Sequence, residues 1–293
     1  MNKLVAWLRI IRPPIILISI LGSYGCLILS DPDSSTRAAI LVSTIAALIA
    51  AGLMVDNDVF DLPSDRVRRS NKALCSGAIS LWQARIAGYI FMSLAGGLAI
   101  LLAWPALLYV WSMLAVGAWY NRRGKHCHIW GNTATAYGVG GIILFPMLVS
   151  GDFRLWPLWL GVFIQEIGRE IMVGIGDVEG DRAAGWRTLP VLVGRGKAHQ
   201  VAGIFYALGI PFFLFQPGIG FVYYFGAIIF AVILIFGWFD TREKMVIADV
   251  RVDPGFDKAG FIFKAFERDL RLWSRLGVLI FQVCILLAAI TAR

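Results

Sequence analysis

Charged residues are scarce in this sequence. Asp, Glu, Lys and Arg make up 16% of its 293 residues, whereas soluble domains carry about 25%. Together with a mean hydropathy of +0.73, this scarcity excludes a disordered chain and an ordinary soluble globule. The sequence therefore predicts an all-α, polytopic membrane bundle, and its length has room for about nine spans of ~20 residues.

Cysteine is also rare, with 4 residues in the whole chain. No two cysteines have Cys-x-x-Cys spacing, so a disulfide framework and a redox motif are both excluded. His126 and His128 flank Cys127, but residues two apart point to different sides in most local geometries. We interpret these histidines as a loop pair in preference to a metal site.

Long apolar runs divide the chain, and each must satisfy its own backbone hydrogen bonds inside a bilayer. Helices are the simple solution for runs of this length. We expect one transmembrane domain covering residues 1–293. The predicted spans are 13–30, 36–56, 80–103, 105–120, 129–150, 154–174, 199–216, 218–238 and 274–291.

The basic residues support this division. With the N-terminus inside and nine spans, 24 of the 27 Lys and Arg residues fall on the inner side. Such an excess is the positive-inside signal of membrane proteins. It predicts a cytoplasmic N-terminus and an outer C-terminus, and it explains the net charge of +8 without nucleic acid. The long connections also fall inside, so we expect a cytoplasmic active site in a cell-membrane protein.

Acidic residues gather in two places. In the first, Asn57, Asp61 and Asp65 recur every four residues, a spacing that keeps them within about 80° on one helix face. Pro63 lies among them, so we expect the helix to kink or end near Asp61. The second stretch has Asp177 and Asp181 at the same spacing, and its many glycines predict a loose or interrupted helix.

Carboxylates that share one face repel one another, and a hard divalent cation relieves that cost. Mg²⁺ takes oxygen ligands and commonly shares its shell between carboxylates and a phosphate. Both acidic stretches end spans that return to the inside, and basic residues follow each. The pattern predicts a cradle for Mg²⁺ and a diphosphate, whereas a lone Asp would be read as a solvated counter-charge.

At this point the sequence resembles the UbiA superfamily of intramembrane prenyltransferases. The family has nine transmembrane helices and two aspartate motifs. The first, Asn-Asp-x-x-Asp-x-x-x-Asp, matches Asn57 to Asp65, and the second, Asp-x-x-x-Asp, matches Asp177 and Asp181. The run DVEGDRAAGWRTLPVLVGR and the basic connection WYNRRGKHCHIWGN also resemble family segments. After the first motif the chain departs from the family, since Lys72 and Ala73 stand where many members have Arg-Pro.

The resemblance implies transfer of an isoprenyl group from an isoprenyl diphosphate to a hydrophobic acceptor, with Mg²⁺ as cofactor and the lipid bilayer as surroundings. Asp61, Asp65, Asp177 and Asp181 would be catalytic, and Asp58 is a weaker candidate for a metal ligand. The implied metal ligands are Asn57, Asp61, Asp65, Asp177 and Asp181. The implied substrate-binding residues are Lys72, Tyr120, Arg122, Arg123, Lys125, Asn132 and Arg182. Aromatic faces that could stabilise an allylic cation are Phe60, Trp119, Tyr120 and Tyr137.

The acceptor is predicted from the second motif. The residues of this motif are most similar to those of members that add a second geranylgeranyl group to geranylgeranylglyceryl phosphate. An aromatic or quinone-precursor acceptor, as in menaquinone- or chlorophyll-type members, is the alternative. A membrane carrier is a weaker rival, because carrier acids lie near the bilayer midplane. A CDP-alcohol phosphotransferase would need an Asp-Gly-x-x-Ala-Arg run, and this sequence has none.

Overall fold

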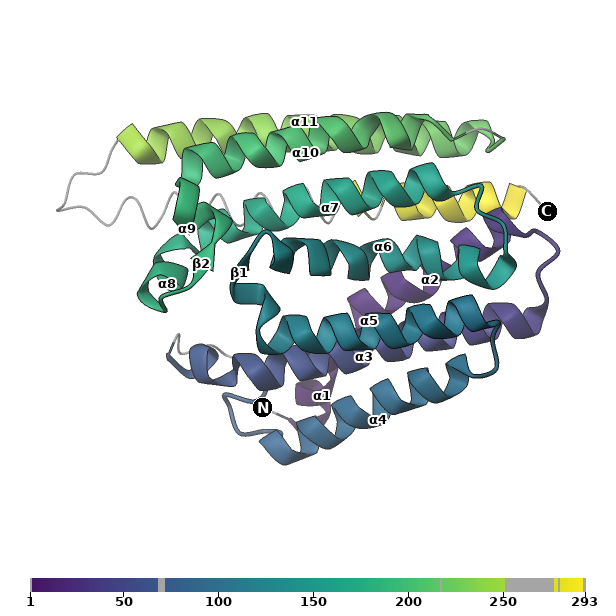
Figure 1. Cartoon of the computed structure of the whole chain (residues 1–293), viewed down its shortest axis with the longest axis horizontal. Helices are drawn as coiled ribbons and strands as arrows, with labels where there is room; N and C mark the ends of the chain where they lie inside the picture. Colours follow the sequence, from purple (N-terminus) through teal and green to yellow (C-terminus); the bar gives the residue numbers. More distant parts are fainter. Residues whose placement is uncertain (1, 68–71, 217, 251–276, 279, 292–293) are drawn as a thin grey trace. The chain divides into compact units, whose positions relative to one another are not determined.

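The structure, a computed structural model, describes residues 2–67, 72–216, 218–250, 277–278 and 280–291. Helices make up nearly all of this part of the chain, as Figure 1 shows. The described strands are two-residue segments, β1 (Cys127–His128) and β2 (Arg187–Thr188), which pair in parallel. The predicted all-α class is confirmed.

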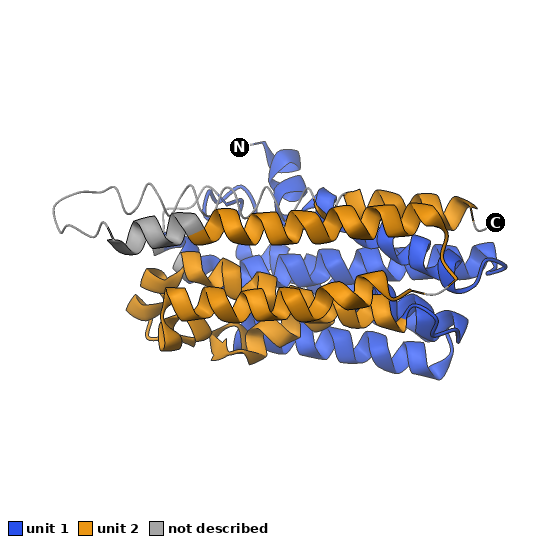
Figure 2. Cartoon of the chain, turned by 90° about the horizontal axis from the view of Figure 1, so that it is seen from above, with its two compact units in different colours: residues 1–123, 141–155 blue, residues 124–140, 156–293 orange. Residues whose placement is uncertain are grey.

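The chain divides into two compact units, coloured separately in Figure 2. Unit 1 contains residues 1–123 and 141–155, and unit 2 contains residues 124–140 and 156–293. Helix α6 (Trp130–Ser150) contributes its first half to unit 2 and its second half to unit 1. The other helices of unit 1 are α1 (Lys3–Ile11), α2 (Pro13–Ser30), α3 (Thr36–Val67), α4 (Leu81–Ala99) and α5 (Trp104–Arg122).

Unit 2 holds the remaining long helices and the two strands. Short elements, the 3-10 turn η1 and helices α8 and α9, lie between the long helices or beside the strands. The helices of this unit are η1 (Gly124–His126), α7 (Trp156–Gly176), α8 (Val178–Ala183), α9 (Leu189–Val193), α10 (Arg195–Leu214), α11 (Phe221–Val250) and a C-terminal apolar helix, Ile280–Thr291.

Every predicted apolar run coincides with a helix in the described residues. Four helical segments are long and apolar enough to cross a membrane by themselves. These are Pro13–Ser30, Thr36–Pro63, Trp130–Ser150 and Phe221–Arg242. Many large apolar side chains on the other long helices are exposed as well, such as Trp82, Trp104 and Leu208. The chain is a multi-pass membrane protein.

Small residues let the helices of each unit approach closely, as is common in membrane bundles. In unit 1, a Cβ on Gly52 of α3 would lie 2.7 Å from Cγ of Met92 on α4. In unit 2, a Cβ on Gly168 of α7 would lie 2.9 Å from the carbonyl oxygen of Ala202 on α10. These glycines bring α3 against α4 and α7 against α10.

The first acidic helix was expected to kink or end near Asp61, and it does not end there. Helix α3 continues through Pro63 to Val67. A proline inside a helix removes one backbone hydrogen bond. Two contacts hold the turns around Pro63: Leu62 is buried in the core of unit 1, and Asp65 is paired with Lys72 beyond the helix. Asp65 therefore stays on the same helix as Asn57 and Asp61.

Candidate active site

The first aspartate motif lies at the C-terminal end of α3. The Asn57 side-chain amide donates a hydrogen bond to Oδ2 of Asp61, 3.1 Å away. Both residues are half-buried, and their spacing of one helical turn places their oxygens on one face. Amide and carboxylate oxygens are hard donors of the kind that Mg²⁺ prefers. This pair fits the metal role predicted from the sequence.

Asp65 is buried, and its charge is balanced by a lysine. Lys72 Nζ lies 2.8 Å from Oδ2 of Asp65 and 3.6 Å from Oδ1 of Asp58. Burial on its own lowers the pKa of Lys72, but the hydrogen bond to Asp65 and the negative charges nearby outweigh it and raise that pKa above its ordinary value. Lys72 is therefore a permanent cation beside the motif at neutral pH.

Asp58 has a second cationic partner, which the sequence did not reveal. Arg12 Nη2 lies 2.6 Å from Oδ1 of Asp58. Arg12 adopts a left-handed conformation, with φ 56° and ψ 68°, in the bend between α1 and α2. A non-glycine residue there is uncommon, and Pro13 at the first position of α2 helps to fix the bend. Asp58 therefore pairs with two cations, Arg12 and Lys72.

The start of the motif is tied to the end of α5. Asn121 donates one hydrogen bond to Oδ2 of the buried Asp56 at 3.0 Å and another to the carbonyl of Leu53 at 3.1 Å. Arg122 lies 3.7 Å from the same Asp56 oxygen, and its guanidinium carbon lies 4.7 Å from the centre of the Phe60 ring. Arg122 thus reaches the first motif. The Phe60 ring, predicted to stabilise an allylic cation, faces the Arg122 guanidinium in this structure.

The second aspartate motif lies where α7 gives way to α8. Asp177 is the residue between the two helices, so the predicted interruption is confirmed. Asp181 is buried, and its Oδ2 accepts a hydrogen bond from the Thr188 hydroxyl at 2.9 Å. Its carbonyl accepts another from the Trp186 amide at 2.8 Å. The turn after α8 therefore folds back onto Asp181 and fixes its carboxylate.

The basic connection before α6 is attached to this turn. Strand β1 pairs with β2, which sets Cys127 opposite Arg187 and His128 opposite Thr188. The His126 and Trp186 rings are in contact, with centroids 3.8 Å apart. Within unit 2, the segment that carries Lys125 is thereby joined to the segment that carries Asp181. The two histidines that were predicted to form a loop pair lie in short elements, His126 in η1 and His128 in β1.

A close backbone approach completes the connection. A Cβ on Gly131 would lie 2.6 Å from the carbonyl oxygen of Gly124, so the loop can double back only over a glycine. Asn132, the next residue, is half-buried. Of the other predicted substrate-binding residues, Tyr120 and Lys125 are half-buried, and Arg123 and Arg182 are exposed.

No group of three His, Cys, Asp or Glu side chains is gathered closely enough to hold a metal ion among the residues that the structure describes. The two motifs belong to different units. Each offers hard oxygen donors, which suits an ion that completes its shell with water and phosphate.

Helix α7 also carries a charged cluster just before the second motif. Arg169 donates to both carboxylate oxygens of Glu166, from Nε at 2.8 Å and from Nη2 at 2.5 Å, and it also pairs with Glu170. Glu166 is buried, so the cluster lies inside unit 2. Its formal charge is −1, since two carboxylates share one guanidinium.

Comparisons with known proteins agree with this geometry. Residues 16–247 match the sequence model of the UbiA prenyltransferase family. The chain belongs to this family. This UbiA prenyltransferase is 32% identical over 232 residues to the digeranylgeranylglyceryl phosphate synthase of Thermococcus kodakarensis. The matched region covers 74% of this chain and 80% of that protein. It is 29% identical over 259 residues to the synthase of Pyrococcus horikoshii, which covers 87% and 89%.

Solved structures share the fold of this UbiA prenyltransferase. One of digeranylgeranylglyceryl phosphate synthase in membranes matches with a TM-score of 0.70 at 24% identity, over 99% of this chain and 100% of the other. A UbiA homologue from Archaeoglobus fulgidus, bound to DMAPP and Mg²⁺, matches with a TM-score of 0.68 at 18% identity, over 94% and 99%.

Proposed function

We propose that this UbiA prenyltransferase transfers a geranylgeranyl group from geranylgeranyl diphosphate to geranylgeranylglyceryl phosphate, in a reaction that depends on Mg²⁺. The observation that carries the proposal is the 32% identity to an archaeal digeranylgeranylglyceryl phosphate synthase over 74% of the chain. The homologue from Archaeoglobus fulgidus holds DMAPP together with Mg²⁺, which supports the choice of donor class and cofactor.

The predicted ligands have the chemistry that this reaction needs. Asn57, Asp61 and Asp65 of unit 1, with Asp177 and Asp181 of unit 2, would hold Mg²⁺ through oxygen atoms, some of them through water. Bound Mg²⁺ supplies Lewis-acid assistance to the departing diphosphate. In this proposal the two motifs converge on one diphosphate, and the two units act as a single domain.

The basic residues neutralise the donor. Lys72 is already beside the first motif, and Lys125 is on the loop attached to the second. Fixed cations at these positions bind the diphosphate and stabilise the charge that develops as the allylic C–O bond breaks. Tyr120, Arg122, Arg123, Asn132 and Arg182 are the further substrate-binding candidates.

The membrane arrangement is part of the proposal. The nine helical runs would all cross the bilayer, with the N-terminus and both aspartate motifs on the cytoplasmic side and the C-terminus outside. The inner position of 24 of the 27 Lys and Arg residues supports this orientation.

Purified protein in detergent or nanodiscs tests the proposal directly. Incubation with geranylgeranyl diphosphate, Mg²⁺ and a panel of acceptors should yield digeranylgeranylglyceryl phosphate by mass spectrometry. Asp61→Ala and Asp177→Ala should each leave folding intact and lower turnover by orders of magnitude. Asp152→Ala is the matched control, because Asp152 lies in the short connection between α6 and α7.

Two results would contradict the proposal. Prenylation of an aromatic acceptor alone would reassign the substrate to the quinone-precursor class. Wild-type turnover in purified Asp61→Ala or Asp177→Ala at saturating Mg²⁺ would remove that residue from the metal site.

A further inference from the structure

Four charged residues of alternating sign form a continuous group beside the first aspartate motif of unit 1. Arg12 Nη2 lies 2.6 Å from Oδ1 of Asp58, and Lys72 Nζ lies 3.6 Å from the same oxygen. Lys72 Nζ also lies 2.8 Å from Oδ2 of Asp65. Two cations and two carboxylates leave the group without formal net charge. Because Asp65 is a predicted metal ligand, the group joins Arg12 to the proposed metal site through Lys72.

The two carboxylates compete for Lys72. Asp58 is 6% exposed and Asp65 is 7% exposed, and a buried carboxylate without a cation nearby is strongly disfavoured. Lys72 carries a compact charge on a flexible stem, and it lies closer to Asp65 than to Asp58. Arg12 occupies the shared Asp58 oxygen at the shorter distance. Without Arg12, Lys72 would be the one cation left among these four residues and would be drawn toward Asp58.

The backbone brings Arg12 to this oxygen at a conformational cost. Arg12 has φ 56° and ψ 68°, a left-handed conformation that is unfavourable for a residue with a side chain. Residues in such conformations persist where the surrounding structure fixes them, and they are common at functional sites. Glycine would adopt the same conformation without a steric penalty. An arginine here therefore indicates that the side chain is needed as well as the bend.

Helix α1 fixes the direction from which Arg12 approaches. Ile10 of α1 is fully buried, and its core cluster contains Val59 of α3 and Leu74 of the segment after α3. The cluster thus joins α1 to both segments that carry the competing charges. The guanidinium also reaches α3 through Nη1, which lies 3.2 Å from Sδ of Met54. Packing of α1 therefore places Arg12 against the helix that carries the first motif.

We infer that Arg12 is a positioning residue for donor binding. By occupying Asp58, it leaves Lys72 beside Asp65, where the ammonium group meets the diphosphate. The inference rests on the proposed function and deepens it, because it assigns to the bend between α1 and α2 the control of a donor-binding cation. Arg12 acts through Lys72 and needs no contact with the substrate.

Two substitutions separate the guanidinium from the bend. Arg12→Gly keeps the left-handed backbone and removes the side chain, and Arg12→Lys keeps a positive charge. The probe is a thio analogue of geranylgeranyl diphosphate, bound with Mg²⁺ and without acceptor. Arg12→Gly should raise its Kd about 3- to 10-fold, the effect of weakening one charge interaction near a protein surface, and Arg12→Lys should recover part of the affinity. The acceptor KM should change by less than about twofold, because only the donor's charge interaction is altered. A wild-type Kd in Arg12→Gly would show that the bend alone matters and would overturn the inference.

A double-mutant cycle tests whether Arg12 acts through Lys72. In a Lys72→Met background, Arg12→Gly should weaken analogue binding by less than about twofold, because residues that act through one another are not additive. Adding Asp58→Asn to Arg12→Gly should bring the Kd back toward the wild-type value, because that carboxylate then no longer competes for Lys72. Fully additive effects of Arg12→Gly and Lys72→Met, or a Kd that Asp58→Asn does not recover, would overturn the inference.

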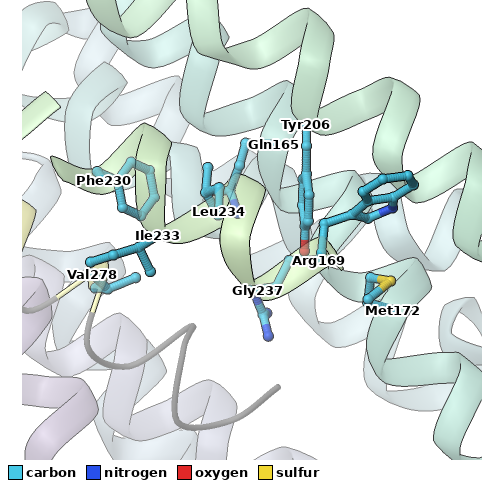
Figure 3. Close-up of a pocket in the computed structure, with 10 residues that line it drawn as sticks. Gln165, Arg169, Met172, Tyr206, Phe230, Ile233, Leu234, Gly237 and Val278 are labelled. Carbon is cyan, nitrogen blue, oxygen red and sulfur yellow. The ribbon is translucent and has the colours of Figure 1, made fainter. Parts of the chain in front are cut away.

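The matched control is a second buried arginine pair, in unit 2. Arg169 pairs with Glu166 and Glu170, which belong to neither aspartate motif, and Figure 3 shows it among side chains of α7, α10 and α11. Arg169→Gln breaks these pairs and so controls for a general loss of stability. Its effect on the Kd should add fully to that of Lys72→Met. Equal non-additivity in the Arg12 and Arg169 variants would show that Lys72 responds to destabilisation in general, and the inference would fail.

Thermal unfolding of the metal-free protein gives a readout that is independent of the reaction. Arg12→Gly leaves the buried Asp58 short of a partner and should lower the Tm, and Asp58→Asn should return part of the loss. If Arg12→Gly does not fold, the double variant decides, because weak analogue binding by the folded double variant would overturn the inference. Absence of prenyl transfer in the wild type, with the binding cycle intact, would instead count against the proposed function and support the role of Arg12.

Discussion

The Thr188 hydroxyl donates a hydrogen bond to Oδ2 of Asp181 across 2.9 Å. Thr188 lies on β2 and Asp181 on α8, so the bond closes the turn that follows the second aspartate motif. A carboxylate held by one oxygen keeps a fixed orientation, which a metal ligand needs. Thr188 thus acts on the proposed metal site through Asp181.

Replacing Thr188 by Val should weaken Mg²⁺ binding while leaving the fold intact. Val keeps the branched shape of Thr and removes the donor to Asp181. Supporting residues of this kind typically change metal affinity or activity 10- to 100-fold. We expect a rise of about tenfold in the Mg²⁺ concentration that gives half-maximal turnover, measured by diphosphate release. Thr188→Ser should stay close to wild type, and equal Mg²⁺ dependence in the Val and Ser variants would refute this role.

Trp186 should support donor binding through its contact with His126, whose ring centroid lies 3.8 Å from its own. Trp186→Ala removes the ring that holds the loop carrying Lys125, so we expect the donor KM to rise about tenfold. Trp186→Phe keeps an aromatic face and should recover most of the affinity. Steady-state kinetics at saturating acceptor measures both values. A fall in kcat with no change in donor KM would show that Trp186 does not position this loop.

Gly131 should tolerate no side chain. Its Cβ would lie 2.6 Å from the Gly124 carbonyl oxygen, whereas a Cβ on Gly138 of the same helix meets nothing within 4 Å. Overpacking of this kind costs about 1–3 kcal/mol. Gly131→Ala should therefore lower the Tm by several degrees and weaken donor binding, and Gly138→Ala should do neither. Thermal unfolding of both variants in one detergent provides the comparison.

Lys72 should bind the donor equally well across the neutral range. Its raised pKa keeps the ammonium charged, so the donor Kd should not depend on Lys72 titration between about pH 6 and 9, and its contribution should fade only above its ordinary value of about 10.4. The ion pairs of Lys72 with Asp58 and Asp65 have the same pH dependence. Because the pKa of Lys72 is raised in the folded state, these pairs stabilise the fold below the ordinary pKa of lysine and lose that effect as the pH rises through the raised value. Lys72→Met should weaken donor binding roughly tenfold, and Lys72→Arg should retain most of it. An unchanged Kd in Lys72→Met would remove this residue from the site.

Much of the fold could be predicted from hydrophobic runs alone, because a helix that satisfies its backbone in lipid needs about 20 apolar residues. The break at Asp177 was also predictable from Gly174, Gly176 and Gly180. The continuation of α3 past Pro63 was not, because it depends on tertiary contacts of Leu62 and Asp65. Local sequence does not contain that information.

The site shows the same limit. Spacing identified Asn57 and Asp61, whose side chains do form a hydrogen bond. Arg12 and Asp58 are 46 positions apart, and no pattern links them. The role of Thr188 could not be predicted for a different reason, because a single threonine in a turn has no sequence pattern that identifies its hydrogen-bond partner. The Thr-Leu-Pro run that begins at Thr188 follows the second aspartate motif in the sequence. Only the structure shows that its threonine bonds to Asp181.

The parallel pairing of β1 with β2 also constrains how the protein is made. Cys127 meets Arg187 only after α6 and α7 have both been synthesised, so a nascent chain that has inserted its first helices still lacks the basic loop in its final place. The turn that carries Asp181 can therefore take its final form only after residue 188 has emerged from the ribosome.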